Sequence, residues 1–371
     1  MVELGRIFRA EDIVQMADGV EASSSGSSHC DGAIQTSGML RVPYGDVIVP
    51  HTGRFPIDRP AWVNRMCITS ATLYTKPAML SVRLANDWQV VLPEYANDKE
   101  YASFRDSVTC DLGVLSHGEP SESAEGGTVT YLSPRMITLM EMYGSDLSLY
   151  PRGQGNPVEV DEPTGSTAVL SRLLASGSWT ALARRTGAMA KATWLNDLQI
   201  ARCDPNTPMV STTRCSGPPP DSPSYGRVTS SPAKVPASHW LVHILQAETQ
   251  ADHCVCVTPG GETWIRLGEA CWTTPSMIVS RTSVGPERSH SIVLADGTRV
   301  RLPDGDPALA ELAARATDWL QLGEASVNPA HVACAFDTGG SLRLYRSPAV
   351  DPAVDITDDA IRAQTRIRLA L

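Results

Sequence analysis

The chain has 371 residues, of which 42% are hydrophobic and 19% charged, and its formal net charge is −10. These values are typical of a globular protein, and they argue against a disordered chain and against broad binding to nucleic-acid backbones. The sequence has no apolar run of about 18 residues, the length that a transmembrane helix requires.

Cysteine usage and the N-terminal residues predict the cellular compartment. The nine cysteines are odd in number and widely scattered, which does not suit a disulfide framework but suits small buried residues in a reducing compartment. The N-terminal residues M-V-E-L-G-R-I-F-R contain an early acid and no apolar signal-peptide segment. We therefore expect an intracellular protein, in a reducing compartment or within a virus particle.

Strand patterns dominate the beginning of the chain, and helix patterns dominate its middle. Apolar runs separated by proline and glycine predict strands over residues 39–92, and residues 98–107 predict a short helix. A serine and a proline at the start and a glycine at the end are typical of a helix over residues 133–144. Residues 166–202 contain further helix patterns, so a helical cluster is predicted over residues 133–203.

A change of composition follows the helical cluster. Residues 204–237 contain eight prolines, including the run Pro218, Pro219 and Pro220, together with many serines and threonines. Such a segment is neither a helix nor a central strand, because proline lacks the amide proton and fixes one backbone angle. It is predicted to be a linker or an extended arm that contacts a partner.

Three β-hairpins are predicted in the last part of the chain. They cover residues 253–267, 291–303 and 331–345, and each has a glycine in its turn. A two-residue turn at Asp296-Gly297 would place Val293 opposite Val300 and put Arg299 and Arg301 together on the exposed face. These two arginines are the predicted contact with a protein partner.

The remaining elements of the last part are a strand and two helices. The run W-L-V-H-I-L at residues 240–245 has the composition of a strand. A helix is predicted to begin at Asp306-Pro307 and to end at Gly323. A C-terminal helix is predicted with Thr357 as its N-terminal cap.

Together these elements predict an α+β fold that is rich in β-hairpins and has a helical cluster near the middle of the chain. Residues 1–203 form a mixed α/β domain, and residues 238–371 form a hairpin-rich α+β domain. The Pro/Ser-rich segment 204–237 joins them.

One internal similarity suggests a duplication. Residues 253–267 and 331–344 share His, Cys and Gly-Gly positions, and each segment follows a Trp-Leu pair. Either a duplicated strand-turn-strand unit or convergent hairpin chemistry explains the similarity.

A metal site is one candidate for the chemistry of this region. His239, His243, Cys254 and Cys256 are zinc-ligand types. If residues 239–245 form a strand, the two histidines lie roughly 13 Å apart at about 3.3 Å per residue, too far to share an ion. We therefore predict no metal and no cofactor.

A Cys–His nucleophilic pair is the second candidate. Cys254, Cys256 or Cys271 would be paired with His239 or His253. The phrase H-W-L-V at residues 239–242 resembles the histidine box of lecithin–retinol acyltransferase-like thiol enzymes, which implies a thiol hydrolase or transferase. The Asn-Cys-Glu element of that family is absent.

An aspartic peptidase is the third candidate. The segment A-F-D-T-G-G-S, residues 335–341, resembles the active-site signature of aspartic peptidases, which implies that Asp337 activates water with a second carboxylate. The sequence has no second Asp-Thr-Gly, so the resemblance implies a homodimer. The alternative is that Asp-Thr-Gly-Gly forms a four-residue hairpin loop.

The sequence contains no phosphate-binding loop, dinucleotide-binding fingerprint or G-x-S-x-G motif. We therefore expect a structural or interaction protein of a large ordered assembly, most readily a viral capsid or capsid-surface protein. Its partners would be copies of itself or another shell protein, with no membrane and no direct nucleic-acid contact. A hydrolase that uses Asp337, or the thiols near residues 239–271, is the alternative.

Overall fold

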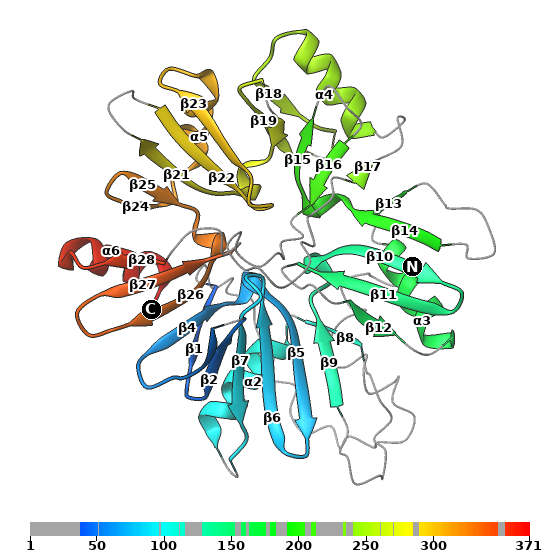
Figure 1. Cartoon of the computed structure of the whole chain (residues 1–371), viewed down its shortest axis with the longest axis vertical. Coiled ribbons are helices and arrows are strands. Elements are labelled where there is room, and N and C mark those ends of the chain that lie inside the picture. Colours follow the sequence, from blue (N-terminus) through cyan, green and yellow to red (C-terminus); the bar gives the residue numbers. More distant parts are fainter. Residues whose placement is uncertain are drawn as a thin grey trace.

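The computed structural model describes residues 38–371 except for 51, 96–97, 111, 116–127, 153–156, 161–162, 176–178, 183–190, 205–208, 213–232, 235–239, 260, 270, 285–288 and 348–352. The strands form five antiparallel sheets. They surround a common centre, and their strands point outward from it (Figure 1). The predicted α+β fold with a helical cluster over residues 133–203 is therefore wrong, because the protein is mostly β and its helices are scattered along the described chain.

The described elements recur five times in the same order along the chain. Each repeat has a leading hairpin of two strands, a 3-10 turn (η), a meander of three strands and an α-helix. The first repeat consists of β1 (Met39–Val42), β4 (Ala61–Asn64), η2 (Arg65–Cys67), β5 (Ile68–Thr75), β6 (Ala78–Leu84), β7 (Gln89–Pro93) and α2 (Lys99–Thr109). The second consists of β8 (Gly113–Leu115), β9 (Thr128–Leu132), η3 (Pro134–Met136), β10 (Ile137–Tyr143), β11 (Asp146–Pro151), β12 (Val158–Val160) and α3 (Pro163–Leu174).

The other three repeats follow the same order. The third consists of β13 (Trp179–Ala181), β14 (Lys191–Asn196), η4 (Asp197–Gln199), β15 (Ile200–Asp204), β16 (Met209–Thr212), β17 (Ala233–Lys234) and α4 (Trp240–Gln250). The fourth consists of β19 (Thr263–Leu267), β20 (Cys271–Thr273), η5 (Pro275–Met277), β21 (Ile278–Val284), β22 (Ser289–Leu294), β23 (Arg299–Pro303) and α5 (Pro307–Arg315). The fifth consists of β24 (Leu320–Leu322), β25 (Ala325–Val327), η6 (Pro329–His331), β26 (Val332–Asp337), β27 (Leu342–Arg346), β28 (Val354–Ile356) and α6 (Asp359–Leu369).

Each leading hairpin joins the sheet of the preceding repeat. The meander of the first repeat and the hairpin β8–β9 form sheet B, and sheets C, D and E are built in the same way from the following repeats. Two additions extend this plan: β2 (Asp46–Val49) and β3 (Gly53–Pro56) lie beside β7 in sheet B, and β18 (Val255–Val257) lies beside β19 in sheet D. Every repeat therefore contributes strands to two neighbouring sheets.

Sheet A closes the ring by pairing the two ends of the described chain. It contains the meander β26–β27–β28 of the fifth repeat and the leading hairpin strands β4 and β1 of the first. The register places Val63 opposite Cys334 and Trp62 opposite Ala335. Closure of this kind pairs strand edges that would otherwise stay open to other chains.

The 3-10 turns connect neighbouring repeats through capping asparagines. Asn64, Asn196 and Asn328 each precede a turn, and each side-chain oxygen accepts the amide proton two residues later. The side-chain amides of Asn196 and Asn328 donate to the carbonyls of Ile137 and Ile278, each at the end of the preceding repeat's 3-10 turn. The Asn64 amide donates to Pro329, within η6 of the fifth repeat. The same side chain thus caps the start of its own turn and binds the turn of the preceding repeat.

The helices lie over the seams between sheets. In the core around α5, Leu309 and Leu312 pack with Ile265 and Leu267 of sheet D and with Ile292 of sheet E. Helices α6 and α2 likewise contact the leading strands of their own repeats, β24 and β1, which belong to the preceding sheets. Removing this apolar surface from water favours the assembled ring by about 25 cal/mol per Å² buried.

Two predicted elements have the opposite secondary structure. The predicted helix over residues 133–144 is η3 followed by strand β10, because its serine and proline begin a 3-10 turn and Gly144, at φ 62°, forms a hairpin turn. The predicted strand at residues 240–245 is the start of helix α4. Its leucines and valine form an apolar stripe that packs on sheet D, since Leu241, Val242 and Leu245 are buried there.

The predicted helices α2 and α6, the start of the predicted helix at Asp306-Pro307 and the three predicted hairpins are confirmed, with local differences. The predicted end of that helix at Gly323 is wrong, because α5 ends at Arg315 and Gly323 lies in the turn of the hairpin β24–β25. Ile292, and not Val293, lies opposite Val300, because four residues separate β22 from β23. The cap of α6 is Asp358, and not Thr357.

The five repeats do not follow the predicted division of the chain. Within residues 204–237, the described strands β16 and β17 pair inside sheet D, in the middle of the third repeat. Residues 253–267 contain β18 and β19, whereas residues 331–344 contain η6, β26 and most of β27. These two segments occupy different positions in their repeats, so the similarity between them is not a duplicated unit. The predicted helix-like segment at residues 9–18 lies outside the described residues.

Candidate anion-binding centre

The inner ends of the sheets meet at the last residues of the five 3-10 turns, which we call the hub. All five of these side chains are at most 8% exposed. They are Cys67, Met136, Gln199, Met277 and His331. The main chain repeats here too: the residues that follow β6, β11, β22 and β27 donate their amide protons to the carbonyls of four hub residues.

Arg152 and His331 make a contact across the hub. Arg152 follows β11 of sheet C, and His331 precedes β26 of sheet A, two sheets that are not neighbours in the ring. A guanidinium nitrogen of Arg152 lies 3.0 Å from Nδ1 of His331, and Nε2 of His331 lies 2.7 Å from the carbonyl oxygen of Ser276. Nδ1 of His331 also lies 3.0 Å from the carbonyl oxygen of Ser347, so this nitrogen faces both a donor and an acceptor. In the neutral imidazole, Nε2–H donates to Ser276 and Nδ1 accepts from Arg152, because arginine only donates.

The protonation of His331 agrees with this assignment. Burial, and secondly the positive charge of Arg152, lower the pKa of His331 to about 3. Burial raises the pKa of Cys67 to about 11, against an opposing effect of Arg152. His331 and Cys67 are thus both neutral near pH 7, and Arg152 carries the charge of this group.

Each of the five sheets places one arginine near the hub. They are Arg346 in sheet A, Arg83 in sheet B, Arg152 in sheet C, Arg202 in sheet D and Arg299 in sheet E. These residues lie at or beside the inner ends of their strands, where the main chain bonds to the hub. The five arginines are far apart in sequence and belong to five different sheets.

Two of these arginines lie close enough to affect each other. Arg346 donates to the hydroxyl of Ser280 in sheet E at 3.2 Å. Burial, and secondly the positive charge of Arg299, lower the pKa of Arg346. Like charges in a partly buried setting repel.

Arg202 has an acidic partner. Its Nε lies 2.8 Å from a carboxylate oxygen of Asp296, whose side chain is only 2% exposed. Asp296 and Asp87 are the acids in the described parts of the loops that follow the second strand of each meander.

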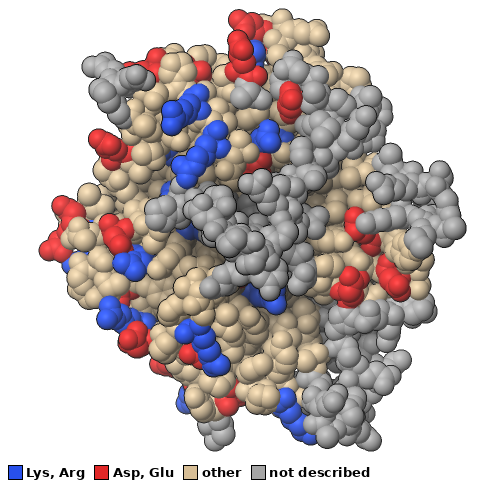
Figure 2. Space-filling view, viewed as in Figure 1, with Lys and Arg blue, Asp and Glu red and all other residues tan. Residues whose placement is uncertain are grey.

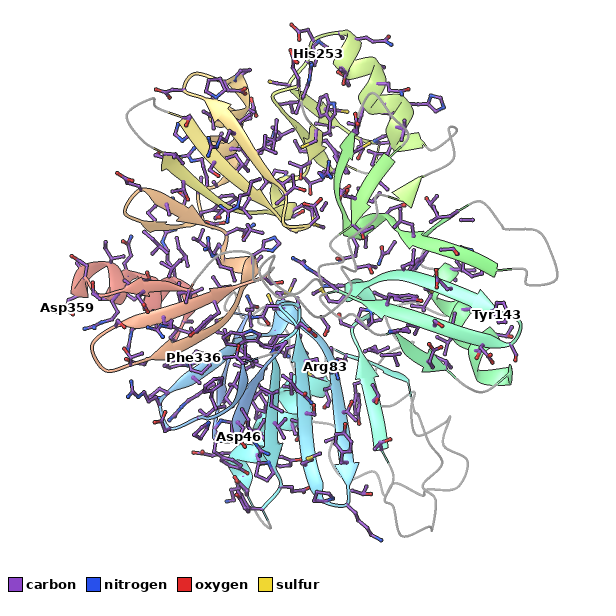
Figure 3. The ribbon with its side chains drawn as sticks, viewed as in Figure 1. Asp46, Arg83, Tyr143, His253, Phe336 and Asp359 are labelled. Carbon is purple, nitrogen blue, oxygen red and sulfur yellow. The ribbon has the colours of Figure 1, made fainter. Side chains whose placement is uncertain are left out.

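Arg83 and Arg299 are the two exposed arginines of this group. Arg83 lies opposite Ser70 and Gln89, and its guanidinium has no ion-pair partner among the described residues. Figure 3 shows Arg83 near the centre, whereas Tyr143, His253 and Asp359 lie toward the rim. On the face seen in Figure 2, acidic side chains lie mostly along the rim and basic ones also lie around the middle. The charge of this face is thus unevenly distributed, although the whole chain is acidic.

The structure does not assemble the zinc-ligand types. His239 lies outside the described residues, and His243 is exposed on α4. Residues 240–245 lie in helix α4 and not in the predicted strand, so the histidine spacing expected along a strand does not apply. Among the described residues, no group of three or more His, Cys, Asp or Glu side chains is placed to hold a metal ion.

The candidate thiols have structural surroundings. Burial raises the pKa of Cys256 and raises that of Cys271 to about 12, and the thiolate is the reactive form. His253 is exposed, and its Nδ1 lies 2.5 Å from Glu248 rather than from a cysteine. No described Cys–His pair of the predicted kind is formed.

Asp337 lies beside a hairpin loop held by α6. Its carboxylate pairs with Arg366 and accepts the amide proton of Gly339. Arg362 donates to the carbonyl of Gly340 at 2.7 Å. Asp337 is the last residue of β26, opposite Leu342, and the four-residue loop between β26 and β27 is Thr338–Ser341. The predicted loop is thus shifted by one residue, and these contacts fix it on the helix.

The predicted interface residues fall into two groups. Arg299 and Arg301 are both exposed, and their strand partners, Val293 and Ser291, lie on the same face of sheet E. Of these two arginines, Arg299 lies at the inner end of strand β23. Pro218, Pro219 and Pro220 lie outside the described residues.

The arginines at 83, 152, 202 and 346 are absent from the predicted site residues. The signal that could have located them is a recurring sequence pattern. It consists of an aromatic residue, any one residue, then Asn, Ser or Thr, any three residues, and finally Ile or Val. It occurs with its aromatic residue at Trp62, Tyr131, Trp194 and Trp272.

Comparisons with family models, with curated proteins and with solved structures find no match for this chain. None of the described helices is long and apolar enough to cross a membrane.

Proposed function

We propose that this protein is a binding protein without catalytic chemistry, whose ring holds an anionic group at the hub. The observation that carries the proposal is that each of the five sheets has an arginine at or beside the inner end of one of its strands. Guanidinium groups bind carboxylates and phosphates through paired hydrogen bonds. An anion between them would also reduce their mutual repulsion.

The repeat architecture supports a binding role. A site built from several strands of a rigid ring holds its side chains more firmly than a site on loops. The asparagine links between neighbouring 3-10 turns fix the inner ends where the arginines lie. Arg83 and Arg299 are exposed, so a ligand can reach them.

The expectation from the sequence, an interaction protein of a larger assembly, belongs to the same class of function. Light scattering on the purified protein tests that assembly, because a shell protein forms particles much heavier than one chain. No contact of Asp337 or of the thiols favours the hydrolase alternative.

Thermal unfolding with added anions tests the proposed centre. Anions that bind only the folded protein stabilise it by about 1.4 kcal/mol for each tenfold excess over the dissociation constant. We expect phosphate to raise the Tm of the unsubstituted protein more than that of Arg83→Gln or Arg299→Gln. Sulfate and phosphate also stabilise proteins by exclusion from their surface, so the difference between proteins is the measured quantity.

Two substitutions serve as matched controls. Lys76→Gln removes one exposed positive charge from the turn between β5 and β6, at the outer end of the hairpin that carries Arg83. Arg315→Gln does the same on α5. Equal phosphate effects in all five proteins would exclude the hub as the anion site.

A further inference from the structure

We infer that two copies of this chain associate face to face, with arginines on sheet E of each copy over carboxylates on sheet C of the other. This inference does not depend on the anion-binding centre. It is drawn from the charges on these two sheets and from the equivalent positions that the charged residues occupy in the ring.

Sheet C has acidic side chains on the face that turns away from helix α3. Along β11 and β12, residues that pack in the core with α3 alternate with more exposed ones. The residues of the opposite face, which we call the carboxylate patch, are Glu141, Tyr143, Asp146, Ser148 and Glu159. Asp146 and Glu159 are exposed, and neither forms an ion pair with a described residue. Ser148 donates to Glu159 at 2.7 Å, and a hydroxyl donor leaves the negative charge in place.

Sheet E has arginines on the equivalent face. Val300 and Leu302 of β23 are buried in the core with α5, so Arg299 and Arg301, which alternate with them, point to the other face. Arg301 lies opposite Ser291. It is exposed and forms no ion pair with a described residue. Arg301 thus brings positive charge to this face of sheet E.

The two charged faces point to the same side of the ring. Each is the face that turns away from the helix of its own repeat, and equivalent faces of repeats arranged around one axis point toward the same end of that axis. Figure 2 shows acidic side chains over sheet C and basic ones over sheet E on one face of the molecule. Two copies that meet through this face can therefore bring unlike charges together.

Glu159 and Arg301 occupy equivalent positions in their repeats. Each lies on the third strand of a meander, and each lies opposite a serine of the second strand, Ser148 or Ser291. Both residues thus lie at a similar distance from the centre of the ring. A twofold axis that crosses the face midway between them places each residue over its counterpart in the partner, so the contact occurs twice in one closed dimer.

Tyr143 adds contact area to the charged residues. Its side chain is 45% exposed, and it lies opposite Asp146 on the carboxylate patch. Tyrosine and arginine are enriched at protein interfaces, whereas a single exposed ion pair contributes little to stability. The charges therefore fix the orientation of the two copies, and Tyr143 supplies area that becomes buried between them.

Sedimentation velocity with charge-reversed variants tests the inference. We expect the unsubstituted protein to form dimers, and the dissociation constant to rise by about tenfold or more in Arg301→Glu and in Glu159→Lys, since like charges then meet at both contacts. The double variant should recover a dissociation constant within about threefold of the unsubstituted protein. An equal mixture of the two single variants should also form dimers, because each contact of the mixed dimer pairs unlike charges.

Arg315→Glu and Glu311→Lys are the controls, because they reverse charges on α5, on the other side of sheet E. Both should dimerise like the unsubstituted protein. A protein that stays monomeric at every concentration overturns the inference, as do particles heavier than two chains. Single variants that dimerise normally, or a double variant that does not recover, overturn it as well. Far-UV circular dichroism close to that of the unsubstituted protein shows that each variant is folded.

Discussion

The side chain of Asn196 links two repeats of the ring. Its amide nitrogen donates to the carbonyl of Ile137 at 2.8 Å, and its oxygen accepts the amide proton of Leu198 at 3.0 Å. Asn196 is 2% exposed, so both bonds are shielded from water. Asn328 makes the same pair of bonds two repeats further along the chain, between the fourth and fifth repeats.

Asn196→Ala should therefore destabilise the fold strongly. Loss of a capping side chain costs about 1 kcal/mol, and a buried carbonyl without its donor costs about 1–3 kcal/mol more. We expect a loss of about 2–4 kcal/mol in urea unfolding, the sum of these two effects. Ser133→Ala is the control, because Ser133 has the equivalent position and its side chain makes no capping bond. Equal losses in the two variants would contradict the linking role of the asparagines.

His331 should make the fold sensitive to acid. Its pKa is about 3 in the folded protein and about 6.5 when exposed, so the unfolded chain takes up a proton first as the pH falls. The stability is fully present above about pH 6.5 and is lost as the pH falls toward 3. Between pH 7 and 4 the unsubstituted protein should lose about 3 kcal/mol more than His331→Gln, whose amide can still accept from Arg152 and donate to Ser276. Unfolding curves at both pH values measure this, and parallel losses would contradict the burial of a neutral histidine.

The closed ring should tolerate new chain ends. Gly38 and Met39 line one groove together with Arg368 and Leu369, so a short glycine–serine linker can join residue 371 to residue 38. A circular permutant opened at the turn between Gly144 and Ser145 keeps all five sheets. We expect a cooperative thermal transition within about 10 °C of that of residues 38–371 with their original ends. A permutant that fails to fold would contradict the pairing of β4 with β26.

Asp337 should stabilise the fold through its contact with α6. Asp337→Asn weakens the pair with Arg366, a pair that is partly screened by water since the two side chains are 36% and 18% exposed. The expected loss is about 1 kcal/mol. Asp359→Asn is the control, because Asp359 is 86% exposed in its pair with Arg362 and should change stability by less than about 0.5 kcal/mol. A hydrolytic activity that disappears in Asp337→Asn would support the peptidase instead.

The sequence predicts local hairpins well and the architecture poorly. The hairpins and the helices α2, α5 and α6 depend on turn residues and caps close in sequence, and these were recognisable. The run W-L-V-H-I-L was assigned to a strand because a short apolar run fits either structure, and its packing on sheet D decides for α4. Cap and proline signals at residues 133–136 mark a 3-10 turn as well as they mark a helix.

The repeat was visible in the sequence, but in another register. W-I-R-L-G-E-A at residues 264–270 matches W-L-Q-L-G-E-A at residues 319–325, and these segments form the equivalent hairpins β19–β20 and β24–β25. The similarity first noted compared segments from different positions of the repeat. The hub could not be predicted, because contacts such as Arg152–His331 form only after the ends of the described chain pair in sheet A.

The position of a bound anion tests the central claim most directly. Crystals soaked in tungstate, a phosphate-like anion with strong anomalous scattering, should show a peak at the hub within hydrogen-bonding distance of guanidinium groups from at least two sheets. The peak should vanish in Arg299→Gln crystals and persist in Arg315→Gln crystals. Tungstate bound only at the rim, with none beside Arg83, Arg299 or Arg346, would contradict an anion-binding centre.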